Sequence, residues 1–451
     1  MRQKNKWLLT TSLIASLVLG LTGCGGQNEA SQTPKVSYAS VVSFGDSLSD
    51  PGAYKVGSIA ALGGGMFTVN GITGGVGSDP TPSYTWAQLV AAAVVGTPSC
   101  AARTGGFGVS VTTVAGCTNY AQGGSRITNP VGTGYNGGNG ALTEPVVMQV
   151  TNYLNSRSNG RFTGSELVTV QGGANELFAQ AGILAAAATQ AGAATFVSSL
   201  AGSLAVDASN PSTAGTAIAV AMVTEAANPG NTTNTIVAAG LGAAAAAGNT
   251  QVGSSAYYLP KVAAANTAGL AAAASYVANT GGPQAVSAMM DAAVELSDSV
   301  KGMRTSGATK IVVSNLPDVS LTPYGLGQDS ATRQLILAMT QAFNAKLRSE
   351  LAGLSGVLFV DVFTENQRQV ATPSQFGLSN VTDTACNLNY GVNPLATAGN
   401  NDGSSLVCKP SNLIAGNTSR YLFADGVHPT PYGHKLLAQL VTKELILAGW
   451  L

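Results

Sequence analysis

The chain contains only two histidines, His428 and His434, so chemistry that needs a general base near neutral pH has two candidates. His428 follows Asp425 by three residues in the turn-rich stretch DGVHPT. A carboxylate at this spacing can bend onto the ring N–H, fix the tautomer and stabilise the imidazolium. His434 lies inside an apolar helical pattern without a nearby carboxylate, which indicates a structural or surface histidine. We therefore take His428 as the candidate base.

A histidine base needs a nucleophile, and Ser47 is the candidate. The stretch VVSFGDSLSD ends a short apolar run at Phe44 and continues with Gly45-Asp46-Ser47. A serine becomes nucleophilic when a base reaches its hydroxyl. Taken alone, this stretch is equally an ordinary turn, because glycine and aspartate are common turn residues. No GxSxG motif occurs in the chain, which counts against an α/β-hydrolase.

The segments around these residues predict strands that alternate with helices. We expect buried strands at 40–44, 167–170, 310–314 and 357–362, and helices at 85–95, 288–303, 331–354 and 432–448. This alternation predicts an α/β protein with a parallel sheet between two helical layers, in which sites form at the carboxyl ends of the strands. The Ala-rich stretch of about 179–280 departs from this rhythm and predicts a helical insertion.

Several ordered sequence blocks carry a resemblance to a known family. FGDSLSD near the start and DGVHPT near the end resemble the motifs of the GDSL, or SGNH, serine ester hydrolases. Between them, NYAQGGS at 119–125 resembles the family's glycine block, QGGANE at 171–176 its GxND block, and NLPDVSLTP at 315–323 a loop after a core strand. The blocks extend from about residue 41 to the C-terminus, apart from the Ala-rich insertion. Agreement of several blocks in order is far more specific than one motif.

The resemblance implies a flavodoxin-like three-layer α/β/α sandwich and a catalytic triad. Ser47 would be the nucleophile, His428 the base, and Asp425 the residue that orients His428. The implied reaction is hydrolysis of a carboxylic ester through an acyl-enzyme, and no metal or organic cofactor is implied.

The resemblance also implies an oxyanion hole. Its donors would be the backbone N–H groups of Ser47 and Gly123 and the side chain of Asn175, which must point to the developing negative charge. Gly124 is the alternative to Gly123, because either glycine can lie at the turn. Glu176 stands where the family usually has aspartate, which affects the expected loop geometry but not the role of the asparagine.

The N-terminus has the pattern of an exported lipoprotein. Basic residues precede the apolar run WLLTTSLIASLVLGL, which is too short for a comfortable transmembrane helix. The run ends in LTGC, which resembles the bacterial lipobox with Cys24 as the lipidated residue. Gly25 follows instead of the usual inner-membrane retention aspartate, so we expect an outer-membrane lipoprotein, on the periplasmic face or the cell surface, or released from the cell. The alternative is a plain secretory signal with a chance cysteine.

This pattern sets the expected domain organisation. Residues 1–24 would be the signal peptide, 25–38 a flexible tether, and 39–451 the hydrolase domain with its insertion at about 179–280. Four further cysteines remain, and an even number in an oxidising compartment indicates two disulfides. The local pairing Cys100–Cys117 and Cys386–Cys408 is the simplest of three, and free buried thiols are the alternative. No pair has CxxC spacing, which argues against a metal site.

The composition of the chain limits the kinds of partner and substrate that are expected. Charged residues make up 9% of the chain and the net charge is zero, so no basic surface for nucleic acid is expected. The apolar insertion and the predicted membrane anchor favour lipid or acyl esters as substrates. A phospholipase or acyltransferase on the same triad is one alternative. A non-enzymatic surface lipoprotein is another, although it should have lost one of the motif residues. Because the insertion follows Asn175 closely, we expect it to cover or line the substrate entrance; the alternative is a helical decoration.

Overall fold

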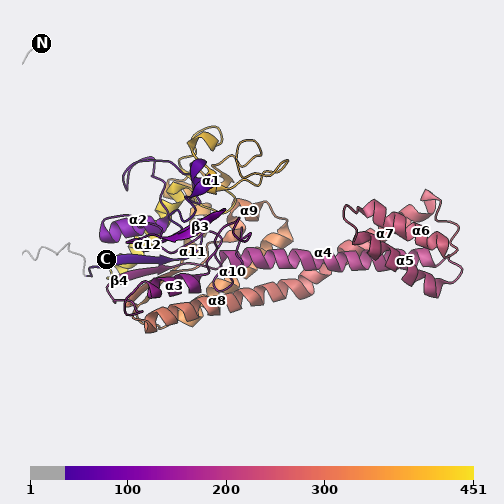
Figure 1. Ribbon diagram of the computed structural model, residues 1–451, viewed down its shortest axis with the longest axis horizontal. Coiled ribbons are helices and arrows are strands. Elements are labelled where there is room, and N and C mark those ends of the chain that lie inside the picture. Colours follow the sequence, from indigo (N-terminus) through magenta and orange to yellow (C-terminus); the bar gives the residue numbers. More distant parts are fainter. Residues whose placement is uncertain (1–35) are drawn as a thin grey trace, which may run out of the picture.

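The protein is described here by a computed structural model, which covers residues 36–451. The predicted signal peptide, Cys24 and most of the predicted tether lie outside these residues. At the centre is a parallel sheet in the order β1-β4-β5-β6 (Figure 1). Its strands are β1 (Ser40–Phe44), β4 (Glu166–Val170), β5 (Lys310–Ser314) and β6 (Val357–Val360). These are the four strands that the sequence predicted.

One predicted strand ends earlier than expected. The sequence predicts residues 361 and 362 as part of the strand, but β6 ends at Val360 and α11 (Val362–Ala371) follows. Asp361 caps this helix, because its carboxylate accepts a hydrogen bond from the Thr364 N–H at 3.2 Å. The apolar run therefore continues across a strand-to-helix junction.

An irregular extended segment lies beside β1 and is joined to it by an isolated parallel bridge between Ser43 and Asn119. Residues 118–122 run parallel to β1. The Ser43 N–H donates a hydrogen bond to the Thr118 carbonyl at 3.2 Å, and the Tyr120 N–H donates one to the Ser43 carbonyl at 2.8 Å. The spatial order is then 118–122, β1, β4, β5, β6, which is the flavodoxin-like 2-1-3-4-5 order. The turn that carries Ser47 and the loop that carries the glycine block therefore leave neighbouring strands at the same end of the sheet.

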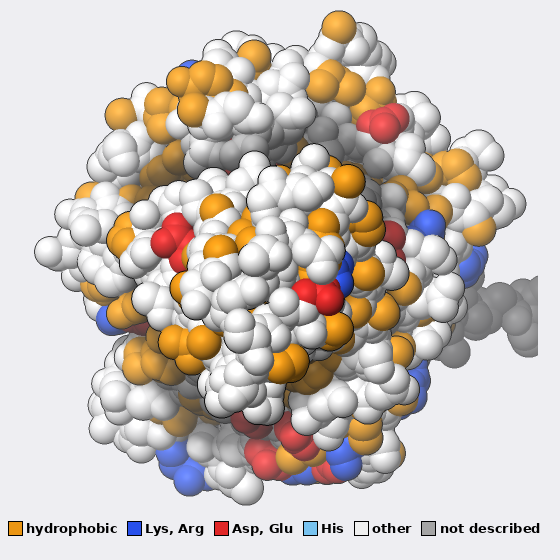
Figure 2. All heavy atoms as spheres, turned by 90° about the vertical axis from the view of Figure 1, so that its right-hand side faces the viewer, with side chains coloured by type: hydrophobic (Ala, Val, Ile, Leu, Met, Phe, Trp, Pro, Cys, Tyr) orange, Lys and Arg blue, Asp and Glu red, His pale blue; other side chains and the backbone are white. Residues whose placement is uncertain are grey.

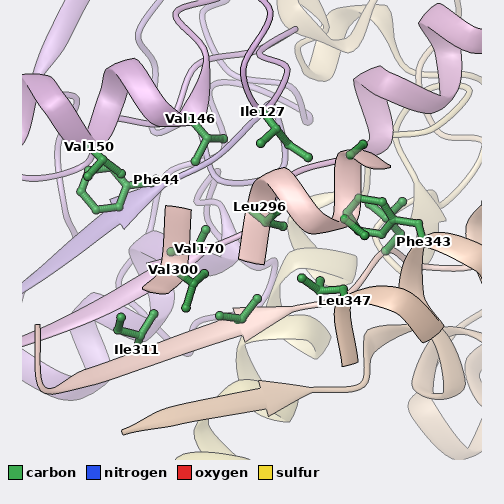
Figure 3. Close-up of a cluster of buried hydrophobic side chains, with 14 of the residues drawn as sticks. Phe44, Ile127, Val146, Val150, Val170, Leu296, Val300, Ile311, Phe343 and Leu347 are labelled. Carbon is green, nitrogen blue, oxygen red and sulfur yellow. The ribbon is translucent and has the colours of Figure 1, made fainter. Parts of the chain in front are cut away.

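Two helical layers cover the sheet, so the predicted three-layer sandwich is confirmed. On one face lie α3 (Val146–Asn155), α8 (Gly282–Thr305) and α10 (Ser330–Leu351). On the other face lie α2 (Trp86–Val95) and α12 (Pro431–Leu447). Successive strand residues point to opposite faces: Phe44 packs in the first layer, as Figure 3 shows, and Val41 in the second.

Shorter elements surround the carboxyl end of the sheet. They are the helices α1 (Gly57–Ala61) and α9 (Pro323–Leu326), the hairpin β2 (Arg103–Gly106) and β3 (Val109–Thr113), and the parallel pair β7 (Asn380–Thr384) and β8 (Tyr421–Phe423). The disulfides Cys100–Cys117 and Cys386–Cys408 are both formed, which confirms the local pairing.

The Ala-rich stretch forms a helical arm that projects from the sandwich (Figure 1). It consists of α4 (Ala174–Ala205), α5 (Pro211–Ala226), α6 (Thr233–Ala246) and α7 (Ser255–Tyr276), which continues through a π-helical turn at Val277–Gly281 into α8. The predicted limits at 179 and 280 do not coincide with helix ends. The physical reason is that α4 serves both parts: Leu177 is buried in the sandwich and Leu200 in the arm's own core.

Within the described residues, α4 is the one helix whose length and composition would allow it to cross a membrane. It packs along α7 and against α5, and both Leu177 and Leu200 are fully buried in protein. Figure 2 looks onto the free end of the arm, where few charged side chains are seen. In the sequence, residues 179–280 contain only Asp207, Glu225 and Lys261 as charged residues.

Candidate active site

Ser47 lies in the tight turn after β1, and its neighbour Gly45 explains the shape of that turn. A Cβ atom on Gly45 would lie 2.6 Å from the Gln171 carbonyl oxygen, so only glycine fits. The buried side chain of Gln149, on α3, holds both backbone groups of Gly45. The Gly45 N–H donates to Gln149 Oε1 at 2.8 Å, and Gln149 Nε2 donates to the Gly45 carbonyl at 2.8 Å. The turn is therefore fixed from both of its sides.

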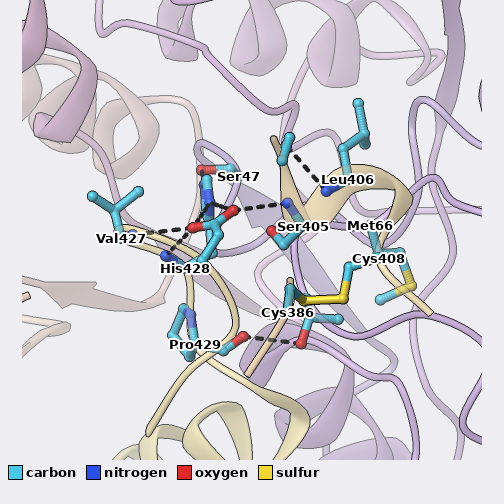
Figure 4. Close-up of polar contacts among 12 residues, drawn as sticks. Ser47, Met66, Cys386, Ser405, Leu406, Cys408, Val427, His428 and Pro429 are labelled. Atoms are coloured by element: carbon cyan, nitrogen blue, oxygen red, sulfur yellow. Dashed lines mark hydrogen bonds and ion pairs between the residues drawn. A yellow bond between two sulfur atoms is a disulfide. The ribbon is translucent and has the colours of Figure 1, made fainter. Parts of the chain in front are cut away.

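The structure brings together the three residues predicted as a triad, although 381 positions separate Ser47 from His428 (Figure 4). His428 Nε2 lies 2.8 Å from Ser47 Oγ. His428 Nδ1 lies 2.8 Å from each oxygen of Asp425. His428 and Asp425 share the loop between β8 and α12, and Ser47 reaches them from the end of β1. This is the geometry that a nucleophile, its base and an orienting carboxylate require.

Asp425 is held as a carboxylate by its surroundings. Burial acts to raise its pKa, but His428 and several hydrogen bonds hold the pKa of Asp425 well below its usual range. The backbone N–H groups of Val427 and His428 donate to Oδ1 at 3.0 and 2.9 Å, and the Ser405 N–H donates to Oδ2 at 2.9 Å. An ionised Asp425 can accept the ring N–H of His428 and stabilise the imidazolium.

A disulfide holds one of these donors in place. Cys386 and Cys408 are both buried, and Ser405 begins the short helical turn that ends directly before Cys408 (Figure 4). The bond closes a loop with a sequence separation of 22, and this loop also supplies Ser404, Leu406 and Leu395 to the wall of the pocket.

Asn175 stands at the start of α4, beside the triad. The helix begins after Gly173, which has φ +118°. The Asn175 side chain is 5% exposed, its Nδ2 donates to the Ser125 carbonyl at 2.9 Å, and it lines the same pocket as Ser47 and His428. An amide with a second N–H at a helix N-terminus, where the helix dipole is positive, is suited to bind an oxyanion.

The structure contradicts Gly123 as an oxyanion donor. The Gly123 N–H already donates to Asp50 Oδ2 at 2.9 Å. Gly124 takes its place: it lines the pocket, and within residues 36–451 its N–H makes no hydrogen bond. Gly124 has φ +79°, and a Cβ atom there would lie 2.0 Å from the Thr133 carbonyl oxygen. The alternative that the sequence left open is therefore the one that the geometry favours.

The pocket beside Ser47 has a volume of about 310 Å³ and a largely apolar wall. The Phe67 ring lies 4.9 Å from the His428 ring. The other large apolar side chains of the wall are Leu48, Phe107, Phe178, Val319, Leu395, Leu406 and Val427. Such a wall suits the hydrocarbon part of a ligand.

The expectation that the insertion covers the entrance is wrong. No residue of 179–280 lines the pocket. From α4, only Ala174, Asn175 and Phe178 reach it, all of them before the predicted start of the insertion. The reason is that α4 is continuous and carries the arm away from the strand ends (Figure 1).

Part of the chain is similar to known proteins. Residues 273–441 match the model of the GDSL-like Lipase/Acylhydrolase family, a stretch that includes Asp425 and His428 but not Ser47. This stretch of the chain is similar to the GDSL lipase/acylhydrolase family. Similar curated proteins include a GDSL esterase/lipase from Arabidopsis thaliana, 26% identical over 150 residues, and Esterase EstA from Pseudomonas aeruginosa, 30% identical over 147 residues.

The matches to these GDSL relatives are partial. They cover 30% and 32% of this chain, and 37% and 20% of the two relatives. The Anther-specific proline-rich protein APG from Arabidopsis thaliana, 29% identical over 147 residues, is matched over 26% of its length. The chain therefore spans well under half of the length of these relatives.

Two further carboxylates near this site, Asp46 and Glu176, are buried. Burial raises the pKa of Asp46 to about 6, although Asp46 Oδ1 accepts the Leu48 N–H at 3.1 Å. Burial also raises the pKa of Glu176 to about 7. Its Oε1 accepts the Ile127 N–H at 2.6 Å and lies 3.5 Å from Arg126 Nε. Glu176, the departure from the family pattern, thus supports the loop after the glycine block.

His434 is structural, as the sequence indicated, and not a surface residue. It is fully buried at the start of α12, and its Nδ1 accepts the Trp86 N–H at 3.3 Å. Burial lowers its pKa to about 3, so the ring is neutral. In the part of the chain that the structure describes, no group of histidine, cysteine and carboxylate side chains could hold a metal ion.

The sequence did not predict three residues that support the site through hydrogen bonds. Gln149 binds the turn at Gly45, and Asp50 binds Gly123 of the glycine block. Ser405 donates a hydrogen bond to Asp425. Asp50 belongs to the quoted FGDSLSD block, so a signal was present. Gln149 and Ser405 belong to no block, because their partners are distant in the sequence.

Proposed function

We propose that this protein is a serine hydrolase that cleaves carboxylic esters through an acyl-enzyme. One observation carries the proposal: His428 Nε2 lies 2.8 Å from Ser47 Oγ, and His428 Nδ1 contacts the buried carboxylate of Asp425. The match of residues 273–441 to the GDSL family model and the similarity to relatives named as esterases support it. All three residues of the proposed triad, Ser47, Asp425 and His428, are present in the sequence.

The reaction follows from the positions of these groups. His428 Nε2 takes the proton of the Ser47 hydroxyl while Oγ attacks the ester carbonyl carbon. The resulting oxyanion is stabilised by the N–H groups of Ser47 and Gly124 and by the Asn175 amide. Collapse breaks the ester bond, and the alcohol leaves with the proton from His428. Water then attacks the acyl-enzyme with His428 again as base, which releases the acid and restores Ser47.

Lipid or acyl esters are the proposed substrates. The wall of the pocket includes phenylalanine, leucine and valine side chains, and Ser47 itself is part of the wall. Burial of a hydrocarbon chain against such a wall contributes about 0.8 kcal/mol per methylene group. We therefore expect esters with an apolar acyl chain to react faster than acetate esters.

We further propose that the protein is an exported outer-membrane lipoprotein with Cys24 as its lipid-modified residue. The charged n-region, the short apolar run and the lipobox-like LTGC support this proposal.

The test of the catalytic proposal is hydrolysis of a panel of p-nitrophenyl esters of increasing chain length. Ser47→Ala should lower kcat by at least about 10³-fold, since removal of the nucleophile leaves only the binding groups. Ser49→Ala is the matched control, because Ser49 is a buried serine in the same turn whose hydroxyl has no partner in the described part of the chain. Equal rates for wild type and Ser47→Ala would contradict the assignment of Ser47, and a wild type that hydrolyses none of the esters would favour a non-enzymatic role. Product analysis with an added acceptor alcohol separates hydrolysis from acyl transfer.

A further inference from the structure

Tyr54 connects the loop after the nucleophile turn to the glycine block. Its side chain is completely buried, and its hydroxyl donates to the Gly123 carbonyl at 2.6 Å. The same oxygen accepts the Thr143 N–H at 3.3 Å. The ring is held edge-on between Phe107 and Phe67, with centroid distances of 5.4 and 6.1 Å. The hydroxyl therefore has one defined position.

The partner of Tyr54 belongs to the peptide unit that carries the Gly124 N–H. The Gly123 carbonyl and the Gly124 N–H are parts of one planar group and, in a trans peptide, point in opposite directions. A hydrogen bond that fixes the carbonyl therefore fixes the direction of the N–H. Gly124 has the positive φ of +79° and no side chain, so its own backbone preference does not fix the orientation of this peptide.

Asp50 holds the preceding peptide. Its Oδ2 accepts the Gly123 N–H at 2.9 Å, and its Oδ1 accepts the N–H groups of Gly52 and Ala53 at 2.8 and 2.6 Å. The segment that carries Tyr54 is thus bound to the same carboxylate as Gly123. Both backbone groups of Gly123 are occupied, one by Asp50 and one by Tyr54.

We propose that Tyr54, together with Asp50, is a positioning residue for the oxyanion hole and orients the Gly123–Gly124 peptide so that the Gly124 N–H points to the reacting carbonyl oxygen. The proposal rests on the proposed ester hydrolysis. The two residues do not touch the substrate and act through the peptide.

Tyr54 also makes the Gly124 N–H a stronger donor. Hydrogen bonds in a chain polarise one another, and here the chain runs from the Thr143 N–H through the Tyr54 hydroxyl to the Gly123 carbonyl. Burial raises the pKa of Tyr54 well above its usual value, so the hydroxyl remains protonated and continues to donate. The expected benefit is largest when negative charge develops on the substrate oxygen.

The test is Tyr54→Phe, which removes only the hydroxyl. We expect kcat on the best p-nitrophenyl ester to fall about 10- to 100-fold, less than loss of a direct oxyanion donor. The KM should change less than about threefold, because the donor acts mainly in the transition state. The affinity of a trifluoromethyl ketone, which forms a tetrahedral adduct with the serine, should fall with kcat/KM. The acid limb of the pH–rate profile should stay in place, because His428 and Asp425 are not touched.

Tyr153→Phe is the matched control. Tyr153 is a buried tyrosine in the same domain, and its hydroxyl donates to Glu166 Oε1 at 2.9 Å, at the amino end of β4 and away from the pocket. Its removal should leave kcat unchanged. A general structural effect of losing a buried hydroxyl would instead lower kcat in both variants in parallel, and that result would overturn the inference.

The outcomes separate the inference from the proposed function. An active wild type, an inactive Ser47→Ala and a Tyr54→Phe variant with wild-type kcat would refute the role of Tyr54 alone. A wild type without activity on any ester would refute the proposed function. If Tyr54→Phe does not fold, Asp50→Asn releases the other side of Gly123. The same selective loss of kcat is expected there, and wild-type kcat in a folded Asp50→Asn variant would overturn the proposal.

Discussion

At the residue scale, two buried carboxylates beside Ser47 have opposite surroundings. Asp425 accepts hydrogen bonds from three backbone N–H groups and from His428, which keeps it ionised. Asp46 accepts only the Leu48 N–H, and its Oδ2 has no partner in the described part of the chain. Burial therefore stabilises the neutral form of Asp46. The two carboxylates therefore contribute differently to the pH dependence of the free energy of unfolding.

For Asp46, we predict that the folded state loses stability as the pH rises. Its folded-state pKa of about 6 lies above the unfolded value of about 3.9, so the native state binds more protons between these values. The free energy of unfolding should therefore fall as the pH rises from about 4 to about 6. Asp46→Asn should remove this part of the slope, and relative to wild type it should gain on the order of 2–3 kcal/mol between pH 4 and pH 7.

Urea denaturation at several pH values measures this effect. Asp291→Asn, at an exposed position of α8, is the control for the loss of a carboxylate elsewhere in the domain. A difference between wild type and Asp46→Asn that does not change with pH would contradict the prediction.

At the element scale, the fold separates the site from the arm. The α/β sandwich and the arm have distinct buried clusters, the latter around Leu200, Leu204, Ile218 and Met222. The helices α4 and α7 meet closely between the two clusters: a Cβ atom on Gly269 would lie 2.8 Å from the Gly192 carbonyl oxygen. In contrast, the loops that carry Ser405 and Asp425 are joined at the site by a hydrogen bond and held by the Cys386–Cys408 disulfide.

We predict that the arm can be shortened without loss of the site. Replacement of residues 193–268 by a short glycine-rich turn would join α4 to α7 where Gly192 and Gly269 meet. The variant should fold, and its kcat and preferred ester chain length should equal those of wild type, because none of the deleted residues lines the pocket. Circular dichroism and the ester panel provide the measurement. A changed chain-length preference in a folded variant would restore the idea of a lid.

The two disulfides should differ in their effect on activity. Replacement of Cys386 and Cys408 by serine should cost about 2–4 kcal/mol of stability. It should also lower kcat about tenfold, because the Ser405 N–H is then less firmly held on Asp425. The pair Cys100–Cys117 closes a loop of similar size, with a sequence separation of 17 compared with 22, and is the matched control. Its loss should affect stability more than kcat, and an equal loss of kcat in both variants would argue against the link to Asp425.

At the scale of the whole molecule, the described chain begins at the end of the sheet opposite to the pocket. The Tyr38 hydroxyl donates to the Trp450 carbonyl at 3.0 Å, so the first described residues lie beside the C-terminus. Ser47 lies at the carboxyl end of β1, and the arm extends in the same direction (Figure 1). A membrane anchor before residue 36 would therefore join the molecule at the face away from the pocket.

We predict that Cys24 determines membrane attachment. Wild type expressed in a bacterium that processes lipoproteins should incorporate labelled palmitate and partition into the detergent phase, because a diacylated cysteine binds membranes stably. Cys24→Ser should do neither, yet it should retain esterase activity, since the site lies within residues 36–451. Partition of wild type into the aqueous phase without label would contradict the lipoprotein proposal.

The sequence by itself determined the sheet, the two helical layers, and the candidates Ser47, Asp425 and His428. These features depend on local periodicity, on a spacing of three residues, and on the scarcity of histidine. It left open the choice between Gly123 and Gly124 and misplaced the arm. Tertiary structure decided both: Asp50 is 73 residues from Gly123 and Tyr54 is 69, and the direction of α4 depends on packing against α7. The direction of a backbone N–H depends on contacts between segments distant in the sequence, and no local pattern records it.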